Sequence, residues 1–368
     1  MGWRRLALLA AITASCPAPA QAPATFLAPA EYPARKPDLA SLAYAPAEGA
    51  GNGHYLDLYL PVASRASPAP IVIWTGGSAW LADNGRDRAG WLASLLVPQG
   101  FAVAGVSIRS STHAPFPAQL HDIKAAIRWL RAHAAQYGLD GAHIGIVGDS
   151  SGGWTAAMAA TTSGLAEWEG AGGSADAASD VQAAVAFYPP TDLLAMDEWA
   201  LRPCSKSVTV AVGRMVPPDF CHDAATSPES RLVGCALQDC PVPARRASPV
   251  TYVRTDSPPM LILHGESDPL VPWNQGARLY QAFVRACGEA TFVSVPKAAH
   301  GIPWDFLRVA PVSEGATIRH VTREGCQVAA PEPFQPSYTL LVDFLKRHLM
   351  PTGPALAASS DGARSSGH

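Results

Sequence analysis

Short apolar runs alternate with longer amphipathic stretches along most of the chain. Runs such as IVIW, IGIV and MLIL are apolar on both faces, which is typical of central parallel strands covered by helices. The stretch HDIKAAIRWLRAHAAQYG places Ile123, Ile127 and Leu130 on one helical stripe, and Gly138 can end that helix. The pattern predicts one α/β domain with a mostly parallel sheet. The predicted strands are 55–60, 71–74, 101–106, 144–147, 183–187, 260–263 and 291–295.

Two segments interrupt this alternation. The first, about residues 197–258, lies between two predicted central strands and contains four cysteines and many prolines. We expect it to form a cap inserted above the strand ends, where it can shape a pocket. The second, about residues 301–336, contains one cysteine and precedes a last helix, YTLLVDFLKRHL. The α/β domain as a whole is predicted to span residues 23–350.

The two ends of the chain differ from this pattern. Arg4 and Arg5 precede a short apolar run, and small residues follow, which is typical of an export signal too short to span a bilayer. We expect residues 1–22 to be that signal and the protein to be secreted or periplasmic, with lipid anchoring at Cys16 as a minor alternative. Residues 351–368 are small and polar without periodicity, and we expect a disordered tail.

The cysteines favour disulfide bonds rather than a metal site. Without Cys16, six of the seven cysteines remain, and an even number in an exported chain favours three disulfides. Six cysteines allow fifteen pairings, and Cys287 with Cys326 is one candidate pair. No pair has metal-site spacing with nearby histidines, so we expect no zinc. The other candidate cysteines are Cys204, Cys221, Cys235 and Cys240.

Composition narrows the classes of partner. The 368 residues are 48% hydrophobic and 15% charged, with a formal net charge of −3. Such a chain can bury a large core, and its charge is too close to neutral to suggest a nucleic-acid or anionic-membrane partner. We therefore expect neither a nucleic-acid partner nor a membrane span, and the oligomeric state stays open.

The stretch GIVGDSSGGW contains two adjacent serines that could act as a nucleophile. A trypsin-like reading needs a β-barrel with a histidine and an aspartate upstream, whereas the flanks here predict a strand and a helix. A strained strand-to-helix turn requires small residues two before and two after its nucleophile. Ser150 has Gly148 and Gly152 at these positions, and Ser151 has an aspartate at one of them. Ser150 is therefore the predicted nucleophile.

A serine hydroxyl needs a histidine as base and a carboxylate that orients the histidine. In this kind of fold the acid and then the histidine follow the serine, each in a loop after a strand. Asp268 in LHGESDPLVP and His300 in AAHG meet both conditions. Asp192 also follows a strand and is a competing acid, and His264 is expected to be structural. Asp149 adjoins the nucleophile, so we expect it to form hydrogen bonds within the turn.

Ester or amide hydrolysis also requires backbone N–H groups that stabilise the developing oxyanion. The residue after the nucleophile, Ser151, should supply one such group. The glycine-rich loop in IVIWTGGSAW follows an early strand and should supply others, for which Gly77 and Ser78 are the candidates.

These motifs together resemble the α/β-hydrolase superfamily, in particular its hormone-sensitive-lipase-like and acetyl xylan or feruloyl esterase-like branch. The similarity runs from YLDLYLP through IVIWTGGSAW, IGIVGDSSGG and LHGESDPLVP to AAHG, from about Tyr55 to His300. It implies an α/β-hydrolase fold and ester hydrolysis without a metal or organic cofactor. One departure concerns the glycine-rich loop, where Gly76 occupies the place of a histidine that usually anchors it.

The expected function is that of an exported serine carboxylesterase acting on small-molecule or carbohydrate-linked esters through an acyl-enzyme intermediate. The same machinery also serves amide and peptide bond hydrolases, which are the alternative within enzymes. A non-catalytic binding protein on the same scaffold is a third hypothesis, and the presence of every expected triad residue argues against it.

Overall fold

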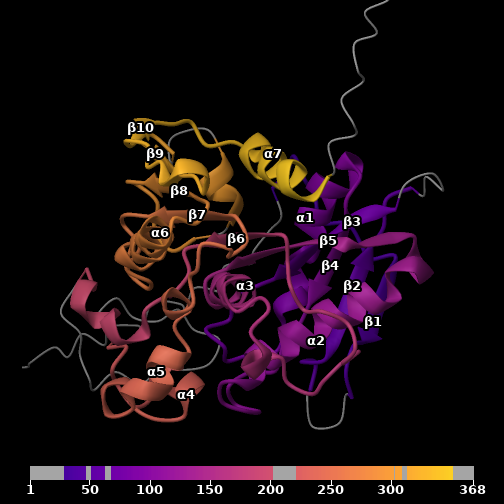
Figure 1. Cartoon of the computed structure of the whole chain (residues 1–368), viewed down its shortest axis with the longest axis horizontal. Coiled ribbons are helices and arrows are strands. Elements are labelled where there is room, and N and C mark those ends of the chain that lie inside the picture. Colours follow the sequence, from indigo (N-terminus) through magenta and orange to yellow (C-terminus); the bar gives the residue numbers. More distant parts are fainter. Residues whose placement is uncertain are drawn as a thin grey trace, which may run out of the picture.

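The computed structural model describes residues 29–46, 51–62, 68–201, 221–301, 303–308 and 313–350. Its centre is a ten-stranded sheet with the order β1-β2-β4-β3-β5-β6-β7-β8-β9-β10 (Figure 1). The six strands from β4 to β8 in this order pair in parallel, and the strands at both edges pair antiparallel. The strands are β1 Leu39–Ala43, β2 Tyr55–Tyr59, β3 Ala69–Thr75, β4 Ala102–Val106, β5 Leu139–Asp149, β6 Ala183–Phe187, β7 Met260–Gly265, β8 Ala290–Val295, β9 Thr317–Val321 and β10 Glu332–Pro333.

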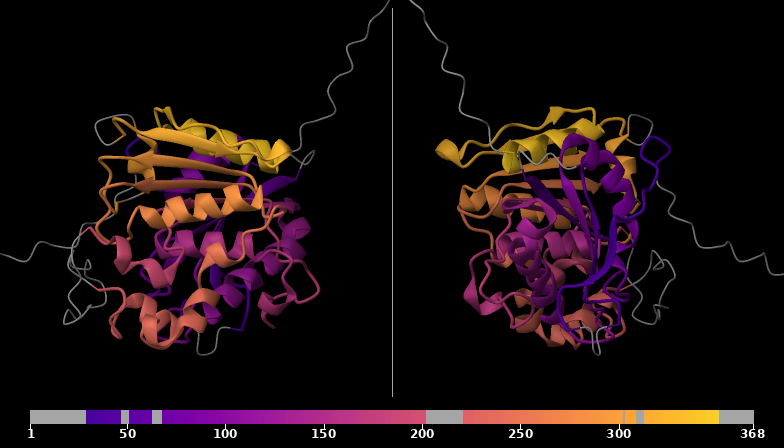
Figure 2. Two further views of the ribbon diagram at one scale, coloured as in Figure 1. Left: turned by 60° about the vertical axis from the view of Figure 1, so that its left-hand side comes forward. Right: turned by 90° about the vertical axis from the view of Figure 1, so that its right-hand side faces the viewer.

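Helices cover both faces of the sheet, which confirms the predicted fold class. Alternate residues of β3 face opposite cores: Ile73 packs with residues of α2, α3 and α6, whereas Trp74 packs with residues of α1 and α7. In the left view of Figure 2, the orange helix α6 and the yellow helix α7 lie on opposite faces. The helices are α1 Ala89–Leu96, α2 Ala118–His133, α3 Ser151–Thr161, α4 Pro228–Val233, α5 Pro241–Arg246, α6 Asn274–Ala286 and α7 Tyr338–Leu349.

The seven predicted strands correspond to β2 through β8, and three edge strands were not predicted. The central runs are buried along their whole length, so their apolar character is continuous in the sequence. By contrast, β1 has exposed positions and both residues of β10 are exposed. Edge strands of this kind lack the hydrophobic pattern on which the prediction depended.

The described part of the first interrupting segment, the predicted cap, packs against α3. Its helices α4 and α5 contribute Leu232 and Ala244 to the core that contains α2 and α3. The indole N–H of Trp154, in the first turn of α3, donates a hydrogen bond to the carbonyl of Ala247 at 2.7 Å. The cap is thereby fixed to the helix that begins beside Ser150. Part of this segment, residues 202–220, lies outside the described residues.

The second interrupting segment extends the sheet. Residues 317–321 form β9, which pairs antiparallel with β8, and β10 pairs with β9. The strands β9 and β10 of this segment are therefore part of the main sheet, a role that the sequence of the segment did not indicate. The predicted signal at residues 1–22 and the predicted tail at residues 351–368 lie outside the described residues. None of the helices in the described ranges has the length and hydrophobicity that a membrane crossing requires.

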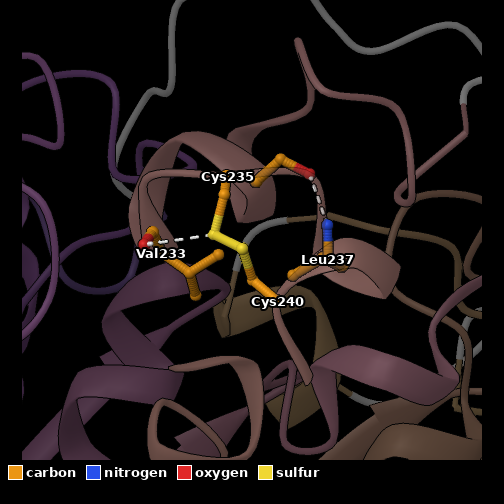
Figure 3. The surroundings of a disulfide bond; sticks show 5 residues. Val233, Cys235, Leu237 and Cys240 are labelled. Carbon is orange, nitrogen blue, oxygen red and sulfur yellow. Dashed lines mark hydrogen bonds between the residues drawn. A yellow bond between two sulfur atoms is a disulfide. The ribbon is translucent and has the colours of Figure 1, made fainter. Parts of the chain in front are cut away.

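Two disulfide bonds join described cysteines. Cys287 at the end of α6 is bonded to Cys326 after β9, which confirms the predicted pair and closes a separation of 39 residues. Cys235 is bonded to Cys240 between α4 and α5, across a separation of only five residues (Figure 3). Loop-closure entropy scales with separation, so the first bond is worth about 4 kcal/mol and the second about 2 kcal/mol. Cys221 is also disulfide-bonded, and Cys204 lies outside the described residues.

Candidate active site

Ser150 occupies a sharp turn between β5 and α3. Its φ of 54° is unfavourable for a residue with a side chain, and surrounding packing must impose it. A Cβ added to Gly148 would collide with the carbonyl of Gly152, and a Cβ added to Gly152 would collide with the carbonyl of Thr75 in β3. The two glycines therefore allow the strand, the helix and β3 to approach closely enough to form this turn.

The carboxyl ends of the parallel strands bring the predicted acid and base to the same edge of the sheet. Asp268 follows β7 and His300 follows β8, and the two loops are in contact because the backbone N–H of Ser267 donates to the carbonyl of Ala298 at 3.1 Å. His300 Nε2 lies 3.1 Å from Ser150 Oγ, and His300 Nδ1 lies 2.8 Å from Asp268 Oδ2. The structure thus brings the three predicted triad side chains together in one hydrogen-bonded chain.

The electrostatics of this chain favour an ionised aspartate beside a basic histidine. Burial opposes ionisation of Asp268, but the charge of His300 and hydrogen bonds from His264 and His300 outweigh it, so the pKa of Asp268 is well below its ordinary value. Burial also opposes protonation of His300. The negative charge of Asp268 and the hydrogen bond to it more than offset that effect, so the pKa of His300 is raised above its ordinary value of 6.5.

Asp268 is further held by its own loop. Its Oδ1 accepts backbone hydrogen bonds from Leu270 and Val271, each at 2.9 Å, so the carboxylate has a fixed orientation toward His300. The competing acid, Asp192, instead pairs with Arg278 at 2.6 Å. Asp192 is thus engaged elsewhere, and Asp268 is the carboxylate beside His300.

The glycine-rich loop after β3 differs from its prediction. Gly77 N–H donates to Asp149 Oδ1 at 2.8 Å, and Ser78 N–H donates to Ser151 Oγ at 2.9 Å. Both predicted donors of this loop, Gly77 and Ser78, therefore already have acceptors within the protein, which disfavours an oxyanion role for either amide. Among the described residues, the amides of Ala79 and Ser151 donate no hydrogen bond to the protein.

The Asp149 carboxylate links several parts of the site, as its expected hydrogen-bonding role suggested. Besides Gly77, its Oδ1 accepts from Arg88 at 3.0 Å, and its Oδ2 lies 3.2 Å from the hydroxyl of Tyr188. That hydroxyl also donates to the carbonyl oxygen of Gly301 at 2.7 Å. The rings of Tyr188 and His300 pack edge to face, with 4.7 Å between their centroids.

Sequence reasoning missed Arg88 and Tyr188. Tyr188 directly follows β6, a strand with its carboxyl end at the site, and that position was an available signal. Arg88 ends a short 3-10 helix, η1 (Gly85–Arg88), for which the hydrophobic pattern offered no signal. In the described ranges, no group of three or more His, Cys, Asp or Glu side chains could hold a metal ion.

Comparisons with known proteins find esterases among the relatives of this chain. A family model described as BD-FAE matches residues 56–283. Esterase LipQ of Mycobacterium tuberculosis is 32% identical to the chain over 253 residues, which cover 68% of this chain and 54% of LipQ. Esterase LipC of the same organism is 27% identical over 266 residues, covering 72% of this chain and 60% of LipC. The chain therefore matches little more than half the length of these relatives.

Solved structures are also similar to this chain, and one example matches most of its length. It is the truncated form of a carbohydrate esterase from gut microbiota, which is 29% identical with a TM-score of 0.63, and the match covers 86% of this chain and 100% of that one.

Proposed function

Because the chain belongs to the BD-FAE family of α/β-hydrolases, as its sequence resemblance predicted, we propose that it is a serine carboxylesterase with Ser150 as nucleophile. The observation that carries the proposal is the hydrogen-bonded chain from Ser150 Oγ through His300 to Asp268. His300 is the general base, and Asp268 orients its ring and stabilises the imidazolium that forms.

The reaction proceeds in two halves. His300 Nε2 takes the proton of Ser150 Oγ as that oxygen attacks the ester carbonyl, and the same nitrogen then gives the proton to the departing alcohol. A water molecule, deprotonated by His300, attacks the resulting acyl-serine. Collapse of the second tetrahedral intermediate releases the carboxylic acid and returns the proton to Ser150. Asp268 remains a carboxylate throughout, in agreement with its lowered pKa.

The oxyanion is stabilised by backbone amides near Ser150. Ser151 N–H keeps the role expected from the sequence, because it is the residue after the nucleophile and has no acceptor in the described protein. In place of Gly77 and Ser78, whose amides have acceptors in the protein, we propose Ala79 N–H as a donor from the glycine-rich loop. Ala79 has a φ of 52° and an amide without an acceptor among the described residues. Each such donor contributes roughly 3 kcal/mol to transition-state stabilisation.

The adjacent serines provide a matched test. Ser150→Ala should lower kcat for 4-nitrophenyl acetate by about 10⁶-fold and abolish labelling by a fluorophosphonate. Ser151→Ala keeps the backbone N–H and should retain the label at Ser150. Labelling that survives in Ser150→Ala and disappears in Ser151→Ala would reverse the assignment. Comparing 4-nitrophenyl acetate with 4-nitroacetanilide separates esterase from amidase activity, and faster anilide hydrolysis would contradict the carboxylesterase proposal.

The alcohol portion of the substrate is proposed to be a carbohydrate. The support is the similarity to a carbohydrate esterase that is covered over its full length. We expect acetylated xylo-oligosaccharides to have a higher kcat/KM than acetate esters of simple alkyl alcohols. Equal kcat/KM for the two acetates would contradict a carbohydrate-specific site while leaving the esterase proposal intact.

Export is also proposed. Disulfide bonds persist mainly in oxidising compartments, and the bonds Cys235–Cys240 and Cys287–Cys326 support this location. Expression of the full chain in a Gram-negative host should yield a periplasmic or secreted protein whose new N-terminus, read by mass spectrometry, follows residue 22 or a nearby position. An intact Met1 on cytoplasmic protein would contradict the proposal.

A further inference from the structure

Arg88 fills space that the glycine at position 76 leaves open. A Cβ added to Gly76 would lie 2.9 Å from a terminal guanidinium nitrogen of Arg88 and 3.4 Å from its Nε. The backbone approaches as well, because Gly76 N–H donates to the carbonyl of Gly85, at the start of η1, at 2.7 Å. The short helix η1 thus packs directly on the glycine-rich loop, and its last side chain occupies the volume of a side chain at position 76.

The guanidinium also closes a ring of hydrogen bonds around Gly77. Arg88 donates to the Gly77 carbonyl at 3.3 Å and to Asp149 Oδ1 at 3.0 Å. The same carboxylate oxygen accepts from Gly77 N–H at 2.8 Å. Both polar groups of Gly77 are therefore held by side chains, and those two side chains are bonded to each other.

The ring is largely shielded from water. The side chain of Asp149 is 4% exposed and that of Arg88 is 18% exposed. Hydrogen bonds between charged groups are stronger than neutral ones, and limited solvent access strengthens them further. Both bonds come from the same terminal nitrogen of Arg88, whose two N–H groups are fixed in the plane of the guanidinium.

The ring lies beside the nucleophile. A Cβ on Gly77 would approach Ser150 Cβ to 2.7 Å, so this part of the loop directly faces Ser150. Ser78 and Ala79 follow immediately in the chain. Any shift of Gly77 therefore moves the N–H of Ala79, the proposed oxyanion donor of this loop, relative to the reacting carbonyl.

We propose that Arg88 is a positioning residue for the glycine-rich loop. It holds the loop in place by occupying the space beside Gly76 and by binding Gly77 together with Asp149. Arg88 does not contact the reacting atoms. The inference rests on the proposed esterase function, because its effect is measured on that reaction.

The test compares two arginines of the same short helix. Arg88→Ala should lower kcat for 4-nitrophenyl acetate by about 30-fold with KM changed less than twofold, because displaced donors weaken transition-state stabilisation more than substrate binding. Arg86→Ala is the matched control: Arg86 also belongs to η1 and pairs with a carboxylate, but that carboxylate belongs to Asp57, at 3.7 Å, and not to Asp149. Its kcat should stay within twofold of the wild type. Guanidinium at millimolar concentration should restore part of the kcat of Arg88→Ala and leave Arg86→Ala unchanged.

A double-mutant cycle tests whether the Arg88 guanidinium and a side chain at position 76 would occupy the same space. Gly76→Ala alone should displace the guanidinium and lower kcat by about tenfold. In the Arg88→Ala background it should lower kcat by only about threefold, because the one tight contact left to the new Cβ is that with the Gly85 carbonyl oxygen at 3.1 Å. Independent effects of the two substitutions would contradict the shared volume. If the alanine variant does not fold, Arg88→Lys replaces it in the test, because lysine keeps the positive charge beside Asp149. The kcat of Arg88→Lys should lie between those of the wild type and Arg88→Ala.

Three results would overturn the inference: wild-type kcat in folded Arg88→Ala, wild-type kcat in Arg88→Lys, or equal losses in the Arg86 and Arg88 variants. Failure of the proposed function is distinguishable, since it would appear as an inactive wild-type protein or as a Ser150→Ala variant with full activity.

Discussion

The turn around Ser150 and the glycine-rich loop beside it are neighbours, but they are held in different ways. The turn depends on residues within five positions of one another, because Gly148 and Gly152 allow the close approach of β5, α3 and β3. The loop depends on side chains from elsewhere in the chain, Arg88, Asp149 and Ser151, that bind its backbone. A local motif is therefore sufficient to single out the proposed nucleophile, whereas the donor geometry of the loop is a tertiary property.

After the loss of Ser150 itself, the largest expected effect comes from substitution of the hydrogen-bonded side chains that serve both regions. Asp268→Asn should lower kcat by about 10⁴-fold, because a neutral amide does not stabilise the imidazolium charge and can donate to Nδ1, which places the proton of His300 on the wrong nitrogen. The residual activity would come from the turn and the loop, which the substitution leaves in place. A loss of less than tenfold would indicate that another carboxylate, such as Asp192, orients His300.

The pH dependence of the same variant has a defined sign. His300 acts as a base only when neutral, so kcat/KM should rise as pH increases through its pKa, with a midpoint above 6.5 in the wild type. In Asp268→Asn the negative charge that raises this pKa is gone, while burial still lowers it. The midpoint should therefore move to lower pH, and a pH–rate profile from 4 to 9 would measure it. A midpoint that moves upward contradicts this assignment.

A substitution in the turn around Ser150 should lower the free energy of unfolding as well as the reactivity of Ser150. Gly152→Ala places a Cβ against the carbonyl of Thr75, so strand and helix must separate. We expect a loss of about 3 kcal/mol in the free energy of unfolding, measured by chemical denaturation, together with loss of Ser150 labelling. Gly172→Ala is a control, because its nearest neighbour, Ala125 Cβ, would be 3.3 Å away. Equal stability of the two variants would show that the turn tolerates a side chain.

The loop should respond to Ser151→Ala with a smaller effect. Ser151 Oγ accepts from the amides of Ser78 at 2.9 Å and Trp80 at 3.3 Å, and alanine leaves both donors without an acceptor. We expect kcat to fall about tenfold while Ser150 remains reactive to a fluorophosphonate. Unchanged kcat would mean that the remaining contacts, chiefly those of Arg88 and Asp149, suffice to hold the loop.

The smallest expected effect is that of Tyr188→Phe. The hydroxyl lies within hydrogen-bonding distance of Asp149 Oδ2 and the Gly301 carbonyl, so it joins the ring around Gly77 to the His300 loop. The phenylalanine keeps the ring contact with His300 and removes only this connection. We expect kcat to fall about threefold without a change in the pH midpoint. A hundredfold loss would show that the two regions are coupled much more strongly than their separate contacts indicate.

Much of the fold could be predicted because its signals are local. The central strands β3, β4, β6 and β7 are short and buried along their whole length, and the pattern of α2 has a helical period. The edge strands β9 and β10 carry no such pattern, since they are stabilised by pairing with β8 and with each other rather than by continuous burial. The disulfide between Cys287 and Cys326 was one of several pairings that the sequence allowed, and only the approach of α6 to the end of β9 selected it.

The amino-acid sequence by itself determined the family and the candidates for nucleophile, acid and base, because each depends on spacing within a short motif or on the position of a loop after a strand. Tertiary structure alone decided which amides remain free and what anchors the glycine-rich loop. Gly77 looked like a donor in the sequence, yet the carboxylate of Asp149 accepts its N–H, and Arg88 fills the space beside Gly76. The availability of a backbone group depends on every side chain that reaches it, and those side chains come from segments that only folding brings together.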